Sequence, residues 1–249
     1  MLSVWLSGDD MRLNRYISAS GAASRRKGED IIRSGRIKVN GEIVTDPARN
    51  VEPGRDTVLM DGKPLVINPE KRYYILNKPE GVIVSRGDTH GRTTVMDLMG
   101  AETKGVVPVG RLDYDTLGVL LLTDDGDLTH RLIHPSFGVD KVYRAVVEGS
   151  VGGDSIRRIR DGLTLEDGPT APAVLTIIES GAEQSIVELT IHQGRNRQVR
   201  RMLDHLGHPV IMLERMSFGG ITAGKMKPGD YRELTSNEVK MLKKMINYK

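Results

Sequence analysis

Two aspartates stand in a polar loop that directly precedes a strongly apolar segment. Asp113 and Asp115 belong to residues 110–118, and the almost entirely apolar residues 119–123 predict a buried strand. A buried strand fixes the loop at its end in position, which suits a catalytic site. Two carboxylates this close in sequence can divide the acid and base roles, as in enzymes that cleave glycosidic bonds.

Two other interpretations of this loop are open. In the first, it binds calcium, because four residues match positions 1, 3, 6 and 12 of the helix-loop-helix calcium pattern: Asp113, Asp115, Gly118 and Asp124. Against it, Leu117 stands where an oxygen ligand is required, and a strand is predicted inside the loop. In the second, both aspartates only cap and turn the loop.

A second segment combines an amphipathic helix with four arginines. Its apolar stripe, at helical spacing within residues 194–207, consists of Val199, Met202, Leu203 and Leu206. At about 100° per residue, Arg197 and Arg201 point away from the stripe and, with Arg195 in the preceding loop, suit phosphate binding. Arg200 lies at the margin of the stripe, where a partly buried guanidinium needs a carboxylate, and Asp113 is the candidate. The simpler alternative is a solvated basic face.

Lys141 and Tyr143 lie on a segment, residues 141–147, that alternates like a strand. A tyrosine on a strand usually belongs to the core, but one that faces a cleft can stack on a nucleic-acid base. The histidines show no paired spacing typical of a metal site, and the chain contains no cysteine. The sequence therefore gives no support for metal or thiol chemistry.

The elements that must position these residues form one larger domain, expected over residues 73–249. The periodicity predicts strands at 73–77, 119–123, 142–147, 174–179 and 185–192, and helices at 127–133, 152–161, 196–206 and 237–246. Several of these strands follow one another without a helix between them. The pattern therefore favours a mixed α+β domain over a parallel doubly wound sheet. The polar residues 68–72, which include a proline, are expected to be a linker.

The N-terminal part of the chain is basic and has its own pattern. Residues 11–50 contain nine Lys or Arg against four Asp or Glu. Leu13 and Ile17 share one face of a short helix, and Ser24 can cap a second one. An Asn-Gly pair within residues 36–44 predicts a hairpin. Three cations occupy the first turn of that helix, where the helix dipole disfavours them and a phosphate would compensate: Arg25, Arg26 and Lys27. We expect a domain over 11–67 and a flexible extension over 1–10.

Length and composition restrict the class of protein. The chain has 249 residues, a net charge of +3 and no cysteine, which suits one or two globular domains in a reducing compartment. No apolar run approaches the roughly 18 residues of a membrane span, and no secretion signal is visible, so a cytoplasmic protein is expected.

The N-terminal segments resemble the alpha-L RNA-binding domain, which also occurs in a small-subunit ribosomal protein and in tyrosyl-tRNA synthetases. The similarity covers about residues 11–65 and is carried by 12–17, 21–26, 31–41 and 58–62. The whole of 11–245 resembles the ribosomal RNA pseudouridine synthases of the RsuA and RluB type. The segments that carry this likeness are 78–81, 88–95, 110–126, 141–143 and 194–202. Residues 194–202 and 85–92 look closer to the large-subunit, B-type enzymes than to the small-subunit type.

This resemblance implies roles for individual residues and a mixed, largely antiparallel sheet in the catalytic domain. Asp113 matches the essential catalytic aspartate, Tyr143 the tyrosine that stacks on uracil, and Arg200 the basic residue that pairs with the aspartate and keeps it ionised. Asp115 matches no catalytic position of the family, which argues against the two-carboxylate interpretation. We expect RNA contacts from Arg25, Arg26, Lys27, Arg36, Lys38, Arg111, Lys141, Arg195, Arg197 and Arg201.

The implied reaction detaches uracil from ribose, turns it and rejoins it through a ring carbon. Asp113 would attack the ribose or remove a ribose proton, and no metal, redox cofactor or nucleotide is needed. The expected partner is ribosomal RNA, either free or in an assembling particle, with the protein as a monomer. The alternative from another class is a non-catalytic RNA-binding module, which would not require Asp113, Tyr143 and Arg200 together. A small-molecule nucleosidase leaves the basic N-terminal domain unexplained.

Overall fold

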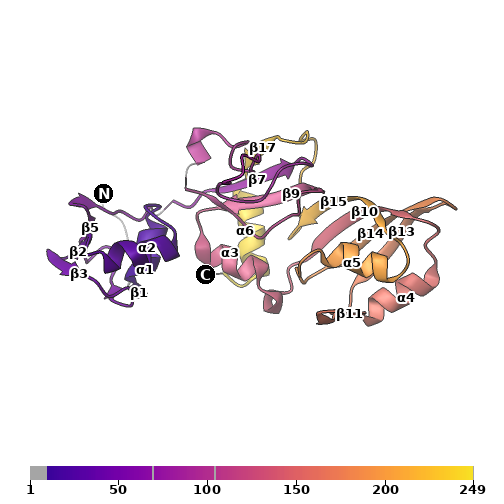
Figure 1. The fold of residues 1–249 in the computed structure, drawn as a ribbon, viewed down its shortest axis with the longest axis horizontal. Helices are drawn as coiled ribbons and strands as arrows, with labels where there is room; N and C mark the ends of the chain where they lie inside the picture. Colours follow the sequence, from indigo (N-terminus) through magenta and orange to yellow (C-terminus); the bar gives the residue numbers. More distant parts are fainter. Residues whose placement is uncertain (1–9, 69, 104, 249) are drawn as a thin grey trace. The chain divides into compact units, whose positions relative to one another are not determined.

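The computed structural model describes residues 10–68, 70–103 and 105–248. The chain divides into two compact units, Met1–Lys71 and Arg72–Lys249, so the boundary falls inside the segment expected to be a linker (Figure 1). Residues 1–9 of the expected N-terminal extension lie outside the described residues. None of the described helices is long and apolar enough to cross a membrane.

The first unit packs two short helices beside a small sheet. Its helices are α1 (Leu13–Ala19) and α2 (Arg25–Arg33), and its sheet has the order β3-β2-β5-β6. These strands are β2 (Ile37–Val39), β3 (Glu42–Val44), β5 (Val58–Met60) and β6 (Lys63–Pro64), while β1 (Met11–Arg12) pairs with β4 (Asn50–Val51). Ser24 caps α2 by accepting a hydrogen bond from the Lys27 amide, as the sequence predicts. At the turn between β2 and β3, Asn40 and Gly41 both have positive φ, which a tight hairpin requires.

The second unit is built on a mixed sheet with the order β13-β14-β10-β15-β9-β7-β17. Its strands are β7 (Tyr73–Lys78), β9 (Thr116–Thr123), β10 (Lys141–Glu148), β13 (Val174–Ser180), β14 (Gln184–Ile191), β15 (Val210–Phe218) and β17 (Tyr231–Glu233). The short β8 (Val107–Pro108) pairs with β9, and β16 (Ile221–Thr222) pairs with β15. All neighbouring strands are antiparallel except β9 and β15, so the predicted α+β class with a largely antiparallel sheet is confirmed.

Helices cover both faces of this sheet. They are α3 (Gly126–Ile133), α4 (Gly153–Asp161), α5 (Gln198–His205) and α6 (Ser236–Met245). β7 alternates between two cores: Tyr74 and Leu76 pack in the cluster that includes α4 and α5, while Tyr73 and Ile75 pack with α3 and α6. The predicted strands and helices of this unit are all present, with ends shifted by at most three residues.

β15 lies in the middle of the sheet, between β10 and β9, and the sequence analysis did not predict it. Glu214 and Arg215 interrupt its apolar pattern, although Arg215 is buried. β9 passes very close to β15 at Gly118, whose φ is +101°. A Cβ at Gly118 would collide with the Arg215 carbonyl oxygen, so this contact requires glycine.

Candidate active site

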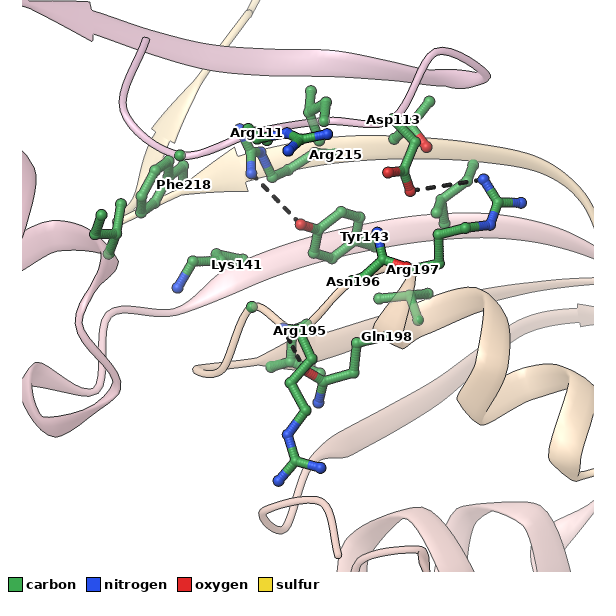
Figure 2. Close-up of a pocket in the computed structure, with 18 of the residues that line it drawn as sticks. Arg111, Asp113, Lys141, Tyr143, Arg195, Asn196, Arg197, Gln198, Arg215 and Phe218 are labelled. Atoms are coloured by element: carbon green, nitrogen blue, oxygen red, sulfur yellow. Dashed lines mark hydrogen bonds and ion pairs between the residues drawn. The ribbon is translucent and has the colours of Figure 1, made fainter. Parts of the chain in front are cut away.

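A cavity of about 390 Å³ opens in the second unit where three parts of the chain meet (Figure 2). The loop before β9 supplies one wall, the adjacent strands β10 and β15 supply the floor, and the loop before α5 supplies the third side. Its polar and aromatic lining consists of Arg111, Asp113, Thr116, Lys141, Tyr143, Arg195, Asn196, Arg197, Gln198, Arg215 and Phe218. The structure therefore brings together residues that lie more than a hundred positions apart in the chain, such as Arg111 and Phe218.

Asp113 reaches this pocket because the loop turns sharply just before β9. Gly110 has a φ of +74°, and the Thr116 amide donates a hydrogen bond to the Asp113 carbonyl oxygen at 3.2 Å. The Asp113 side chain is 28% exposed, and its Oδ2 lies 3.8 Å from Nη1 of Arg197. This carboxylate is thus held beside a cation and still open to a ligand in the pocket (Figure 2).

Arg197 reaches Asp113 because the chain takes an unusual conformation at the start of α5. Arg197 is the N-cap residue, with a φ of +45° and a ψ of 32°, a left-handed conformation that is uncommon for a residue other than glycine. Its guanidinium also donates to both carboxylate oxygens of Asp115, at 3.1 and 3.3 Å. One arginine therefore bridges the two aspartates of the loop.

The predicted pair between Arg200 and Asp113 is not formed, which corrects the sequence analysis. Nη2 of Arg200 lies 3.2 Å from Oδ2 of Asp115 and donates to the Asp115 carbonyl oxygen at 2.8 Å. Its Nη1 donates to the Val210 carbonyl oxygen at 3.3 Å, and its side chain is 11% exposed. The physical reason is that α5 begins at Gln198. Arg197 therefore lies before the helix and lines the pocket, whereas Arg200 lies about one helical turn later, contacts Asp115 and does not line the pocket.

Asp115 acts as the centre of this charge network. Burial alone would raise the pKa of Asp115, but the hydrogen bond from Arg197 and the charge of Arg200 outweigh it and hold that pKa below its ordinary value. Burial lowers the pKa of Lys78 to about 8, and its ammonium donates to the carbonyl oxygens of Thr116 and Pro79 at 2.9 and 3.0 Å. The loop that carries Asp113 is therefore held by two arginines at Asp115 and by Lys78 at Thr116.

The calcium interpretation does not agree with the structure. Asp124 accepts hydrogen bonds from the backbone and side chain of Arg72. It lies beyond the far end of the eight-residue strand β9, roughly 25 Å along the strand from the loop of Asp113. One ion cannot bridge these carboxylates.

Tyr143 lies on the floor of the pocket, 8% exposed, on a strand that alternates as predicted. Its hydroxyl points toward Arg215, whose Nη1 donates to it at 3.4 Å (Figure 2). Arg215 is the residue that the sequence analysis missed, because a charged side chain inside a central strand has no simple pattern. The one available signal is the strand-forming run that follows Pro209, which places Leu213 and Arg215 on the same face.

Two arginines that were expected to bind phosphate have partners inside the chain. Arg201 forms a bidentate ion pair with Asp167, in which both hydrogen bonds are 2.8 Å long. Arg195 donates hydrogen bonds to the backbone carbonyl oxygens of Asp167 and Gly168. The hydrogen bond from Arg201 lowers the pKa of Asp167 to about 2. Both arginines thus attach the hairpin of β11 (Thr164–Leu165) and β12 (Gly168–Pro169) to α5.

The other basic candidates differ in exposure. Lys141 is buried and lines the pocket, whereas Arg111 lines it and is exposed. In the first unit Arg36 pairs with Asp61. The remaining candidates there are exposed: Arg25, Arg26, Lys27 and Lys38.

Comparisons with known proteins agree with this division of the chain. Residues 72–205 match the family of RNA pseudouridylate synthases, and residues 11–56 match the S4 domain. The ribosomal large subunit pseudouridine synthase B of Bacillus subtilis is 42% identical over 239 residues, covering 95% of this chain and 97% of its own length. The ribosomal small subunit pseudouridine synthase A of Escherichia coli is 38% identical, covering 92% and 98%.

A solved structure described as a pseudouridylate synthase has the same fold. It aligns with a TM-score of 0.68 and 32% identity, covering 93% of this chain and 99% of that one. An RNA-binding S4 domain followed by a catalytic unit of this kind defines an RNA-modifying enzyme. The chain belongs to the RNA pseudouridine synthases of the RsuA and RluB type, as the resemblance indicated. It is an isomerase that rearranges a nucleotide within the RNA chain, so the non-catalytic alternative is set aside.

Proposed function

We propose that this enzyme converts one specific uridine of large-subunit ribosomal RNA to pseudouridine, with Asp113 as the essential catalytic residue. The observation that carries the proposal is the Asp113 carboxylate at the pocket, 3.8 Å from the Arg197 guanidinium. The large-subunit assignment is supported by the 42% identity to the B-type enzyme of Bacillus subtilis. The small-subunit RNA is the second candidate, because the small-subunit enzyme of Escherichia coli is 38% identical.

The reaction exchanges one bond of the nucleoside for another. The N1–C1′ bond breaks, the C5–C1′ bond forms, the C5 hydrogen leaves to solvent and N1 gains a proton. Asp113 either attacks C1′ or removes the C2′ proton, and both routes need its ionised form. The neighbouring Arg197 limits the directions in which the carboxylate can turn.

The pocket suits a nucleotide that has been flipped out of its stack. Its volume of about 390 Å³ is in the range of pockets that enclose small organic ligands. Flipping costs a few kcal/mol of lost stacking and pairing, and stacking on Tyr143 recovers part of this. Arg200 takes the role of a positioning residue, because it acts on Asp113 through Asp115.

The exposed cations supply the wider contact with RNA. In the first unit, the first turn of α2 presents Arg25, Arg26 and Lys27 with no acidic residue among them. Arg111 supplies a further cation at the rim of the catalytic pocket. The proposed enzyme is a cytoplasmic monomer that binds ribosomal RNA, free or in an assembling particle.

Mapping of pseudouridine with a carbodiimide reagent tests the substrate directly, because the isomers have equal mass. Ribosomal RNA from cells that lack this protein should lose one large-subunit signal, and wild-type protein should restore it. Restoration by Asp113→Asn would contradict the catalytic assignment. Loss of a small-subunit signal instead would replace the large-subunit assignment by the second candidate.

A further inference from the structure

The floor of the pocket contains two buried cations side by side. Lys141 is 6% exposed and Arg215 is 2% exposed, and both line the cavity. Both lie over the same ring, with Nζ of Lys141 5.1 Å and Cζ of Arg215 5.0 Å from the centroid of Phe218. In the sheet register Lys141 lies opposite Phe218, and Tyr143 lies opposite Arg215. Adjacent strands therefore hold these four side chains as one rigid block.

Neither cation has a carboxylate partner in the part of the chain that the structure describes. Lys141 donates to the Val139 carbonyl oxygen at 2.8 Å, and Arg215 donates through Nε to the Val119 carbonyl oxygen at 2.6 Å. Burial and the charge of Arg215 together lower the pKa of Lys141 to about 8, although Asp140 opposes this shift. Two adjacent buried cations are costly unless a negative group joins them.

One atom of this block is left without a partner. Nη2 of Arg215 is buried and forms no hydrogen bond with any described residue, and the same holds for Oγ1 of Thr116 in the same pocket. Removing a donor from solvent without giving it a partner is unfavourable, so a buried donor of this kind that lines a pocket calls for an explanation. The free donor of Arg215 therefore marks a place for an acceptor that arrives with the substrate.

The position of this donor relative to Asp113 indicates what the acceptor is. The Tyr143 hydroxyl points toward Arg215, and the Asp113–Arg197 pair lies on the other side of the ring (Figure 2). A uridine with C1′ at Asp113 and its base stacked on Tyr143 extends its carbonyl oxygens toward Arg215. A backbone phosphate belongs beside the ribose, at the Asp113 end.

We propose that Arg215, supported by the charge of Lys141, binds a carbonyl oxygen of uracil and stabilises the negative charge that the detached base carries. This role of Arg215 rests on the proposed function. When the N1–C1′ bond breaks, its electron pair leaves with the uracil, and the charge spreads over N1, O2 and O4. The same pair later forms the C5–C1′ bond, C5 loses its proton to solvent and N1 takes one up. Both routes open to Asp113 produce this anion.

The symmetry of uracil explains how one fixed donor can serve both halves of the reaction. Turning the ring by half a turn about the N3–C6 axis exchanges N1 with C5, and it also exchanges O2 with O4. A cation that faces one carbonyl oxygen before the turn faces the other after it. Arg215 can therefore hold the base without blocking its rotation, and the rigid block of β10 and β15 keeps the cation in place.

The test compares Arg215→Met and Arg215→Lys with wild type. Arg144→Met is the matched control, since Arg144 also lies on a central strand but pairs with Glu188 and does not line the pocket. Release of tritium from RNA labelled at C5 of uridine, in a single turnover at saturating enzyme, measures the chemistry. Filter retention measures RNA binding, and thermal unfolding checks that each variant is folded.

We expect Arg215→Met to release tritium about 100-fold more slowly or worse, with unchanged RNA affinity, and Arg215→Lys to recover part of the rate. Arg144→Met should behave as wild type. Weaker binding with an unchanged saturated rate would identify a phosphate contact and overturn the inference. If wild type releases tritium from large-subunit RNA and Arg215→Met does so equally well, the inference fails while the proposed function stands.

A better leaving group separates charge stabilisation from a purely structural role. Fluorine at C5 withdraws electron density and thereby stabilises the negative charge of the detached base. The reaction of RNA that contains 5-fluorouridine therefore depends less on the cation. Chromatography of the nuclease-digested RNA measures the rate at which intact 5-fluorouridine disappears. The reduction of this rate in Arg215→Met should be several-fold smaller than the reduction of its tritium-release rate. An equal defect with both substrates would overturn the inference, because a distorted pocket harms both alike.

Discussion

Replacing Asp115 by Asn should loosen the loop that carries Asp113 without removing the proposed catalytic carboxylate. Asp115 holds two arginines, with Nη1 of Arg197 at 3.1 Å and Nη2 of Arg200 at 3.2 Å. Removing one partner of a fully buried ion pair costs about 3–5 kcal/mol, whereas an exposed pair contributes about 0–1 kcal/mol. The Arg200 side chain is 11% exposed and that of Asp115 is 37% exposed, so the pair is intermediate. We expect a loss of about 1–2 kcal/mol in the free energy of unfolding.

The pH dependence of this loss follows from the lowered pKa of Asp115. A carboxylate whose pKa is lowered by folding contributes its full stability above its unfolded pKa of about 3.9, and loses it as the pH falls through the folded pKa. The difference between wild type and Asp115→Asn should therefore be constant from about pH 5 to 8 and narrow below about pH 4. At neutral pH the loss corresponds to a fall of about 2 to 8 °C in the Tm of the catalytic unit.

Thermal and urea unfolding of the full chain at several pH values measure this difference. In the tritium-release assay, Asp115→Asn should keep activity, lowered about tenfold, because Asp113 remains but Arg197 is less well fixed. Equal stability of the two proteins at pH 7 would refute the network. An activity as low as that of Asp113→Asn would refute the division of roles between the two aspartates.

Three further predictions follow from local contacts. Lys78→Met removes the ammonium that binds carbonyl oxygens beside the loop of Asp113, so the free energy of unfolding in urea should fall by about 1–3 kcal/mol. An unchanged unfolding midpoint would contradict this. Gly118→Ala should destabilise the sheet by more than about 2 kcal/mol, because its Cβ meets the β15 backbone, whereas Gly126→Ala, with open space around the new Cβ, should not. Changing both Arg25 and Arg26 to Glu should weaken RNA binding and reduce its salt dependence while the rate at saturating RNA stays unchanged; a lowered saturated rate would place these residues in the chemistry instead.

Much of the fold could be predicted because its elements carry local patterns. The helix of Leu13 and Ile17, the hairpin at Asn40 and Gly41, and five strands of the large sheet (β7, β9, β10, β13 and β14) each follow from periodicity or turn chemistry. β15 has no such pattern, because the burial of Arg215 depends on neighbouring strands from distant parts of the chain. Contacts with distant parts of the chain therefore determine that residues 210–218 form β15, the central strand that the sequence did not indicate.

The candidate site shows the same limit at the level of single residues. The sequence brought Asp113, Tyr143 and the arginines of α5 into one hypothesis, and the structure places Asp113, Tyr143 and Arg197 around one pocket. It could not indicate which arginine reaches Asp113, because that depends on the left-handed conformation of Arg197 at the start of α5. Nor could it show that Asp167, in a hairpin nearly thirty residues earlier, occupies Arg195 and Arg201.

In the proposed reaction the Asp113 carboxylate performs the chemistry. The most direct test is a single-turnover comparison of wild type and Asp113→Asn on large-subunit ribosomal RNA labelled with tritium at C5 of uridine. The variant should bind this RNA as tightly as wild type and release no tritium above background. Tritium release by Asp113→Asn at the wild-type rate would contradict it.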